Sequence, residues 1–181
     1  MERVAYPETA VYFDVCLARL GVTLLTDEVA ILRASVREVR RKRPFGIGAW
    51  VVLPDRMCAI WHVPRSDPNY GQRWGAIKAR FSRDLRRAGR APDWAFAEPG
   101  PKGEVGIWQR RFSDHVIRGS GDYDDHLRRC LGSPVRMGLV ARPEDWAFSS
   151  IHRDMREGRK RACGVDGVRQ RSVPPGDPVT R

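Results

Sequence analysis

The sequence has 181 residues, 33 of them Lys or Arg and 22 Asp or Glu, and a formal net charge of +11. This length suits one domain with a sizeable core. No apolar run approaches the roughly 18 residues of a membrane span. The four scattered cysteines include no Cys-x-x-Cys pair, which argues against a zinc knuckle or a disulfide framework and favours a cytoplasmic location. The basic excess, nearly all arginine, is typical of nucleic-acid-binding proteins.

Hydrophobic periodicity and turn residues predict the elements in chain order. A strand is expected at 11–18. A helix is expected at 26–41, with Thr26 as its N-terminal cap and Pro44 ending it. A hairpin of strands 46–53 and 57–63 follows, then a helix at 70–87, a strand at 107–118 and a helix at 123–131. The segment 135–150 is expected to be irregular, with Trp146 and Phe148 as its anchors.

This order predicts an α+β, ferredoxin-like split βαβ sandwich: an antiparallel sheet with two helices on one face and an additional C-terminal helix. Residues 1–152 are expected to form the domain. Residues 153–181, rich in Arg, Gly and Pro, are expected to form a basic and mostly disordered tail.

The third strand predicts which sheet face could carry a site, because successive strand residues point to opposite faces. One set is fully apolar and should lie under the helices: Met57, Ala59, Trp61 and Val63. The other set should point to the open face: Arg56, Cys58, Ile60 and His62. A metal or nucleic-acid site is therefore expected on that second face.

Several short stretches, taken in order over about residues 10 to 153, resemble one protein family. They are Val-Val-Leu-Pro-Asp at 51–55, Ile-Trp at 60–61, Arg-Trp-x-x-Ile-Lys-x-Arg-Phe-Ser at 73–82, Gly-Ile-Trp-Gln-Arg-Arg-Phe at 106–112, His-Val-Ile-Arg at 115–118, and Pro-Val-x-x-Gly-Leu-Val-Ala-Arg-Pro-Glu-Asp-Trp-x-x-Ser-Ser at 134–150. In these stretches the chain resembles the REP-associated tyrosine transposases, relatives of the IS200/IS605-type transposases in the HUH endonuclease superfamily.

The resemblance implies a His-x-His pair that holds Mg²⁺ or Mn²⁺, and a tyrosine that attacks phosphorus to form a covalent phosphotyrosine. The matching positions here hold Arg56 and Cys58 in place of the histidines and Arg129 in place of the tyrosine. Arginine neither ligates a metal nor acts as a nucleophile at neutral pH, and a lone thiol suits hard cations poorly. No intact catalytic residue, no metal site and no cofactor are therefore expected.

Other residues are not expected to replace the missing metal ligands and nucleophile. Tyr123 lies six residues before Arg129, so it is expected to point away from the active face, as a half-buried or capping side chain. Cys58 and His62 lie about 13 Å apart along a strand, too far to share one ion. His115 and His126 match family positions and are expected to be structural.

The resemblance and the charge together predict a DNA contact surface. Its expected members are Arg73, Lys78, Arg80 and Arg83 on the basic helix, with Arg110 and Arg111 beside Trp108. A solvated helix face is the alternative for each arginine. Trp74 and Phe81 are expected in the core.

The sequence thus favours a protein that binds single-stranded or hairpin DNA of repeat palindromes, as a monomer or homodimer away from membranes, without strand cleavage. An active transposase that uses substitute residues is the first alternative. An RNA-binding module is the second, although the aromatic ribonucleoprotein motifs that such modules carry on their central strands are missing.

Overall fold

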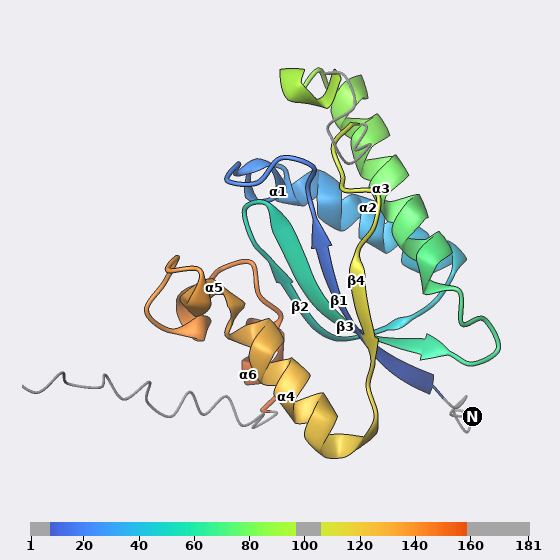
Figure 1. Cartoon of the computed structure of the whole chain (residues 1–181), viewed down its shortest axis with the longest axis vertical. Coiled ribbons are helices and arrows are strands. Elements are labelled where there is room, and N and C mark those ends of the chain that lie inside the picture. Colours follow the sequence, from blue (N-terminus) through green and yellow to red (C-terminus); the bar gives the residue numbers. More distant parts are fainter. Residues whose placement is uncertain (1–7, 97–105, 159–181) are drawn as a thin grey trace, which may run out of the picture.

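The computed structural model describes residues 8–96 and 106–158. Its centre is a four-stranded antiparallel sheet of order β2-β3-β1-β4 (Figure 1). The strands are β1 (Glu8–Cys16), β2 (Gly46–Val52), β3 (Arg56–Pro64) and β4 (Ser113–Val116). A helical segment links β1 to β2 and a second links β3 to β4, so the predicted ferredoxin-like fold is confirmed.

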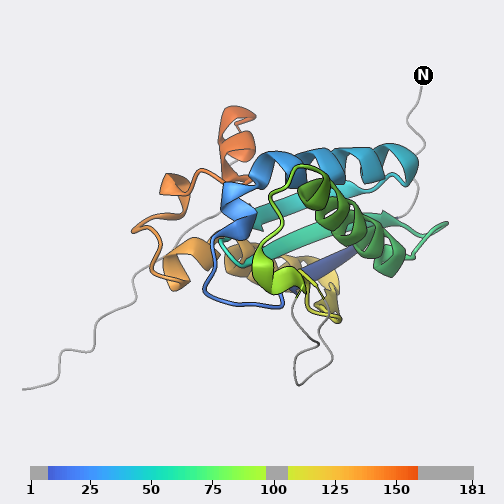
Figure 2. The ribbon, with the colours of Figure 1, turned by 90° about the horizontal axis from the view of Figure 1, so that it is seen from above.

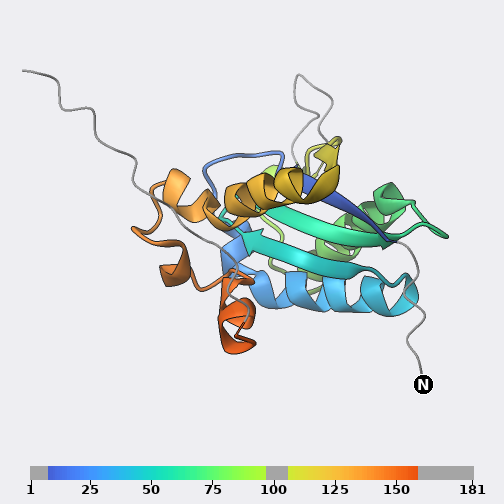
Figure 3. The same cartoon turned by 90° about the horizontal axis from the view of Figure 1, so that it is seen from below.

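Helices cover both faces of this sheet. Two long helices lie side by side on one face (Figure 2). A third crosses the other face (Figure 3). The first two are α2 (Val29–Lys42) and α3 (Tyr70–Arg87), and the third is α4 (Gly119–Leu131); the short helices are α1 (Leu24–Asp27), α5 (Ser133–Arg136) and α6 (Ile151–Arg156), with 3-10 turns η1 (Asp93–Phe96) and η2 (Pro143–Asp145). None of the described helices is long and apolar enough to cross a membrane.

The core under α2 and α3 is built on aromatic side chains. Trp61 of β3 stacks on Trp74 of α3, with ring centroids 4.2 Å apart and an angle of 17° between the rings. Phe13 of β1 and Phe81 of α3 are also fully buried there. The apolar set of β3 therefore lies under the helices as predicted, and Trp74 and Phe81 are confirmed as core residues.

A second core fills the opposite face, which the sequence led us to expect open. Cys58 and Ile60 of β3 lie under Leu127 and Cys130 of α4. The cause is a stripe on α4, where Leu127, Cys130 and Leu131 recur at helical spacing and need an apolar partner. Only the margins of this face remain for a functional site.

The outer edge of β2 is covered by the chain that follows α5. Val52 donates its N–H to Phe148 O at 2.9 Å, and Ser150 donates to Trp50 O at 2.8 Å. The Trp146 indole donates to Val52 O at 2.8 Å. These bonds protect an edge that would otherwise offer unpaired backbone groups to another strand, and they support the predicted anchoring role of Trp146 and Phe148.

Several predicted boundaries differ from the structure. Strand β1 begins at Glu8 and α4 begins at Gly119, each earlier than expected. The helix expected at 26–41 is divided into α1 and α2, and Thr26 lies inside α1 and does not cap it. The strand expected at 107–118 is ordered as β4 only over Ser113–Val116, with a single bridge at Trp108 before it. Helix α6 runs from Ile151 to Arg156 and so crosses the domain boundary expected at 152. Its Ile151 and Asp154 are buried against the rest of the domain. Residues 159–181 of the expected tail lie outside the described part of the chain.

Candidate functional site

Arg56 stands at the first of the two positions where the resemblance implies histidine. Its Nε donates to Asp55 Oδ1 at 3.1 Å, and Arg56 is 30% exposed. Asp55 is buried and its other oxygen accepts the Gly21 N–H at 2.8 Å. The guanidinium of Arg56 therefore neutralises a buried carboxylate in the hairpin turn, which is a structural task.

Cys58, at the second position, is 3% exposed beneath α4. The Cys130 thiol donates to Cys58 O at 3.3 Å. Burial raises the pKa of the Cys58 thiol and raises that of Cys130 well above its usual range. Both thiols are therefore protonated at neutral pH, and a buried thiol suits a hard cation such as Mg²⁺ poorly. With Arg56 beside it, this place does not fit the divalent cation that the family resemblance implies.

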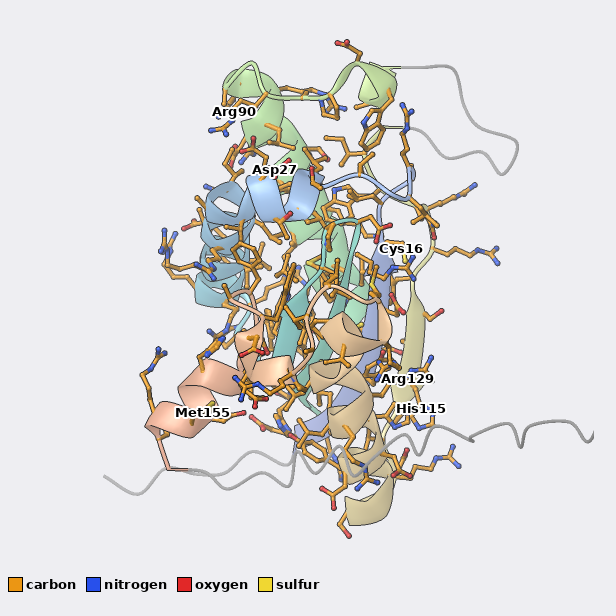
Figure 4. All side chains as sticks on the ribbon, turned by 90° about the vertical axis from the view of Figure 1, so that its left-hand side faces the viewer. Cys16, Asp27, Arg90, His115, Arg129 and Met155 are labelled. Atoms are coloured by element: carbon orange, nitrogen blue, oxygen red, sulfur yellow. The ribbon has the colours of Figure 1, made fainter. Side chains whose placement is uncertain are left out.

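Arg129, at the position of the implied tyrosine, is exposed on the flank of α4. Its guanidinium carbon lies 5.8 Å from the centre of the Tyr12 ring. Tyr12 packs in the same core cluster as Cys58. Helix α4 and β3 thus bring the Arg129 and Cys58 positions close to one tyrosine, as an active site built from both would need. Figure 4 shows Arg129 on the same side of the molecule as His115.

Tyr12 and Tyr123 are the tyrosines of this face. Burial raises the pKa of the Tyr12 hydroxyl far above its usual range, so it does not supply a phenolate. Tyr123 is half-buried, which is one of its two expected environments, but it does not point away from the sheet as predicted: it shares the apolar stripe of Leu127 and packs on the sheet. Its ring stacks on His62 with centroids 5.9 Å apart. Both the Tyr123 hydroxyl and His62 Nε2 lie 2.8 Å from where a Cβ on Gly48 would stand.

The two histidines expected to be structural meet at one carboxylate. His115 of β4 and His126 of α4 both contact Asp122 of α4 at 2.9 Å. This cluster lies next to Tyr12, whose ring centre is 5.0 Å from that of His126. The Asp122–His126 pair follows from i, i+4 spacing on α4, whereas the approach of His115 depends on how α4 meets β4.

Arg73, predicted to contact DNA, is instead a buried structural residue with 1% exposure. It donates to the backbone oxygens of Asp67 and Pro44 and forms an ion pair with the Asp67 carboxylate at 2.9 Å. These acceptors tie the start of α3 to the loops around it. The prediction for Arg73 is corrected on this ground, since its guanidinium is not accessible to a phosphate.

The remaining basic residues of α3 differ in how available they are. Lys78 donates to Gln109 O at 3.0 Å and lies over the Phe112 ring, and burial lowers its pKa. Arg80 and Arg83 both pair with Asp84, at 3.6 and 3.1 Å, and are 34% and 47% exposed. Only these two arginines of the predicted α3 set present an open charged surface.

Arg110 and Arg111 are exposed in the segment before β4, as a DNA contact would require. Trp108, however, is 7% exposed and packs edge-on against Phe81 at 5.4 Å. The aromatic partner predicted for base stacking therefore belongs to the core. The guanidinium groups alone remain as contacts there.

A groove of about 400 Å³ beside α2 adds a surface that the predicted set of contacts omits. Its floor is apolar, with Trp50, Val36 and Phe148, and arginines rim it: Arg33, Arg37, Arg40 and Arg153. Arg33, Arg37 and Arg40 recur at i, i+4 and i+7, a spacing that places them on one helix stripe and could have been recognised in the sequence.

Comparison with known proteins gives these features a family. No family model matches the sequence. A REP-associated tyrosine transposase of Escherichia coli K12 is 37% identical over 147 residues, covering 81% of this chain and 79% of the relative. A Haemophilus influenzae protein assigned to the same family is 34% identical over 146 residues, covering 80% and 81%.

A solved structure described as the REP-associated tyrosine transposase bound to a REP hairpin has a TM-score of 0.73 at 32% identity. It covers 100% of this chain and 99% of that one. The structural match therefore includes the sheet, α4 and the arginine-bearing helices together. The chain therefore belongs to the REP-associated tyrosine transposase family.

Proposed function

We propose that this protein binds single-stranded or hairpin DNA of repeat palindromes and does not cleave it. One observation carries the proposal: all three positions that would hold the metal and the nucleophile are replaced, and each replacement is used structurally or faces solvent. Arg56 neutralises Asp55, Cys58 is a buried thiol, and Arg129 lies exposed over Tyr12. Such a site retains the frame of the family without its chemistry.

The net charge and the family relationship support the DNA-binding part of the proposal. The net charge of +11 favours a polyanion. The solved relative at 32% identity is bound to a REP hairpin. Arginine presents a planar fork that suits phosphate oxygens, and the chain offers it on the rim of the α2 groove and on the outer face of α3.

Binding is tested by fluorescence anisotropy with three labelled DNAs: a palindromic hairpin with a single-stranded extension, the extension alone, and a fully paired duplex. We expect the hairpin or single strand to bind more tightly than the duplex. The affinity should fall with salt, with a log-log slope of about −0.7 per phosphate contact on a single strand. Equal binding to all three DNAs, or no binding at low salt, would contradict the proposal.

Cleavage is tested separately, with an end-labelled hairpin in the presence of Mg²⁺ or Mn²⁺. We expect neither a shortened strand nor a covalent protein–DNA adduct on a denaturing gel. The Escherichia coli relative serves as the control for the assay conditions. A covalent adduct formed by this chain would show that strand cleavage persists.

An active transposase with a substitute nucleophile is the second candidate, because Tyr123 faces the sheet beside His62. Should an adduct form, Tyr123→Phe distinguishes the candidates. Loss of the adduct in this variant would assign the nucleophile to Tyr123. Persistence of the adduct would assign it to another residue.

A further inference from the structure

Three metal-ligating side chains converge where β4 meets the first turns of α4. His115 Nε2 lies 2.9 Å from Asp122 Oδ2, and His126 Nδ1 lies 2.9 Å from Asp122 Oδ1. The ligand atoms of all three residues lie within 4.8 Å of one another. Among the residues that the structure describes, these three side chains are the metal-ligating group placed closely enough to surround one ion.

The arrangement brings three electron-pair donors together, and His126 Nδ1 also lies 2.9 Å from the backbone oxygen of Asp122. Two imidazole nitrogens and a carboxylate face one another, so either protons or a metal ion must separate their lone pairs. Asp122 Oδ2 also accepts the Arg118 N–H, so hydrogen-bond donors of β4 and α4 converge on this carboxylate. A metal ion can take the place of the imidazole protons at such a point.

We propose that His115, Asp122 and His126 bind one divalent transition-metal ion of the Zn²⁺ class. Two histidines and one carboxylate are a donor set that Zn²⁺ accepts, with a fourth position left for water or an oxygen ligand. Hard cations such as Mg²⁺ prefer oxygen donors and are disfavoured here.

The geometry requires a small adjustment that the structure permits. In a tetrahedral site the donor atoms stand roughly 3.3 Å apart, for bonds of about 2.0–2.1 Å. The two imidazole rings are stacked with centroids 4.4 Å apart, so one ring must turn for both nitrogens to point at one ion. His115 can turn because its side chain is 47% exposed, whereas His126 is held against Tyr12.

Surrounding contacts already orient the carboxylate. Asp122 Oδ2 accepts the Arg118 N–H at 2.7 Å, where the chain turns from β4 into α4. Such secondary hydrogen bonds orient ligands in metal sites. The site is distinct from the place of the implied His-x-His pair, because Arg56 and Cys58 contribute no ligand to it.

The test uses the full chain without a histidine tag, stripped with a chelator and titrated with Co²⁺ and Zn²⁺. We expect visible Co²⁺ absorption and one-to-one binding by calorimetry. His115→Asn, Asp122→Asn and His126→Asn should each weaken affinity at least about tenfold. His152→Asn is the matched control, because His152 lies on α6, bonded to Trp146 O.

Absence of one-to-one binding by the wild-type protein would overturn the proposal, as would unchanged affinity in both His115→Asn and Asp122→Asn. Circular dichroism checks that each variant is folded. If the other variants unfold, the result for His115→Asn decides the test, because the exposed His115 side chain adds little to the core. Hairpin binding is measured in parallel, so failure of the metal site is distinguishable from failure of DNA binding.

Discussion

Arg73 and Arg83 show that residues of the same type on one helix can have opposite tasks. Arg73 is 1% exposed and spans several backbone oxygens, whereas Arg83 is 47% exposed beside Asp84. We expect Arg73→Ala to lower the free energy of unfolding by about 2–4 kcal/mol, because it removes the charge-assisted hydrogen bonds of a buried guanidinium to several backbone oxygens. Arg83→Ala should cost less than about 1 kcal/mol. Urea unfolding measures both.

The same pair separates stability from DNA binding. If Arg73→Ala lowers hairpin affinity while its unfolding midpoint stays at the wild-type value, the assignment of Arg73 to a structural role is wrong. DNA binding must be compared in urea-free buffer, at a temperature below the thermal unfolding transition of the less stable variant. Only folded protein is then titrated.

Gly48 lies at a β-bulge in β2, where the register with β3 shifts between Ile47 and Ala49. A Cβ there would meet His62 Nε2 and the Tyr123 hydroxyl at 2.8 Å. We expect Gly48→Ala to cost about 1–3 kcal/mol of stability through overpacking, because both rings must move.

Gly75→Ala is the matched control for this prediction. A Cβ at Gly75 meets nothing within 4 Å, on an exposed position of α3. Alanine should therefore stabilise the protein by roughly 0.5–1 kcal/mol through helix propensity. Thermal unfolding of the two variants should show shifts of opposite sign. A stable Gly48→Ala protein would mean that the contact between α4 and β2 is loose.

For single helices and strands, hydrophobic periodicity predicted the bounds correctly where the sequence of that element alone determines them. The bounds of α3 were predicted to the residue, because Trp74, Ile77, Phe81 and Leu85 form a strong stripe. The strand expected at 107–118 was too long, because the ladder with β1 covers only Ser113–Val116 and the residues before it join β1 through isolated bonds such as Gln109 N–H to Cys16 O. Helix α6 was missed because its burial depends on a docking that no local pattern reveals.

The candidate site followed the same division. The replaced positions could be recognised from the order of motifs, and the structure places Arg129 and Cys58 close to Tyr12. Asp122 and His126 are spaced i, i+4 on α4, which the sequence could have shown, whereas the approach of His115 depends on how β4 meets α4. The burial of Arg73 was equally hidden, since its acceptors are backbone oxygens in loops.

The two arginine-bearing helices make separable predictions about DNA. We expect Arg33→Ala with Arg37→Ala, on the α2 groove, to weaken hairpin binding more than Arg80→Ala with Arg83→Ala on α3. The reason is that Asp84 already pairs with both α3 arginines. Each lost phosphate contact on a single strand should also reduce the salt slope by about 0.7. Anisotropy titrations at several salt concentrations measure both quantities.

Circular dichroism and urea unfolding should confirm that both double variants remain folded, because all four side chains lie at the surface of their helices. Equal affinities for wild type and the α2 double variant would move the DNA surface away from the groove. A larger loss in the α3 variant would assign it to the outer face of that helix.

For the whole molecule, the sheet separates two chemically different sides. Helices α2 and α3 lie on one side of the sheet and α4 on the other (Figures 2 and 3). The groove and the α3 arginines belong to the first side. Arg129 and the histidine cluster belong to the side of α4. A ligand that touched both sides would have to pass around an edge of the sheet. The β2 edge is covered by residues 148–150, whereas the exposed strand β4 forms the other edge.

This arrangement predicts that the lost chemistry cannot be restored by the three obvious substitutions. In Arg56→His, Cys58→His and Arg129→Tyr together, the first removes the partner of buried Asp55. The second inserts an imidazole where Cys58 is 3% exposed beneath Cys130, which should cost about 1–3 kcal/mol by overpacking. The third leaves a tyrosine on the exposed flank of α4, facing no formed metal site.

We therefore expect the triple variant to be less stable than the wild type and to form no covalent adduct with a labelled hairpin in Mn²⁺. Urea unfolding measures the first effect and a denaturing gel the second. Arg129→Tyr alone is the control, and it should fold normally because position 129 is exposed. Adduct formation by the triple variant, but not by Arg129→Tyr, would show instead that the surroundings of Cys58 still accept a metal-binding pair, and that only the side chains at these three positions separate this chain from an active enzyme.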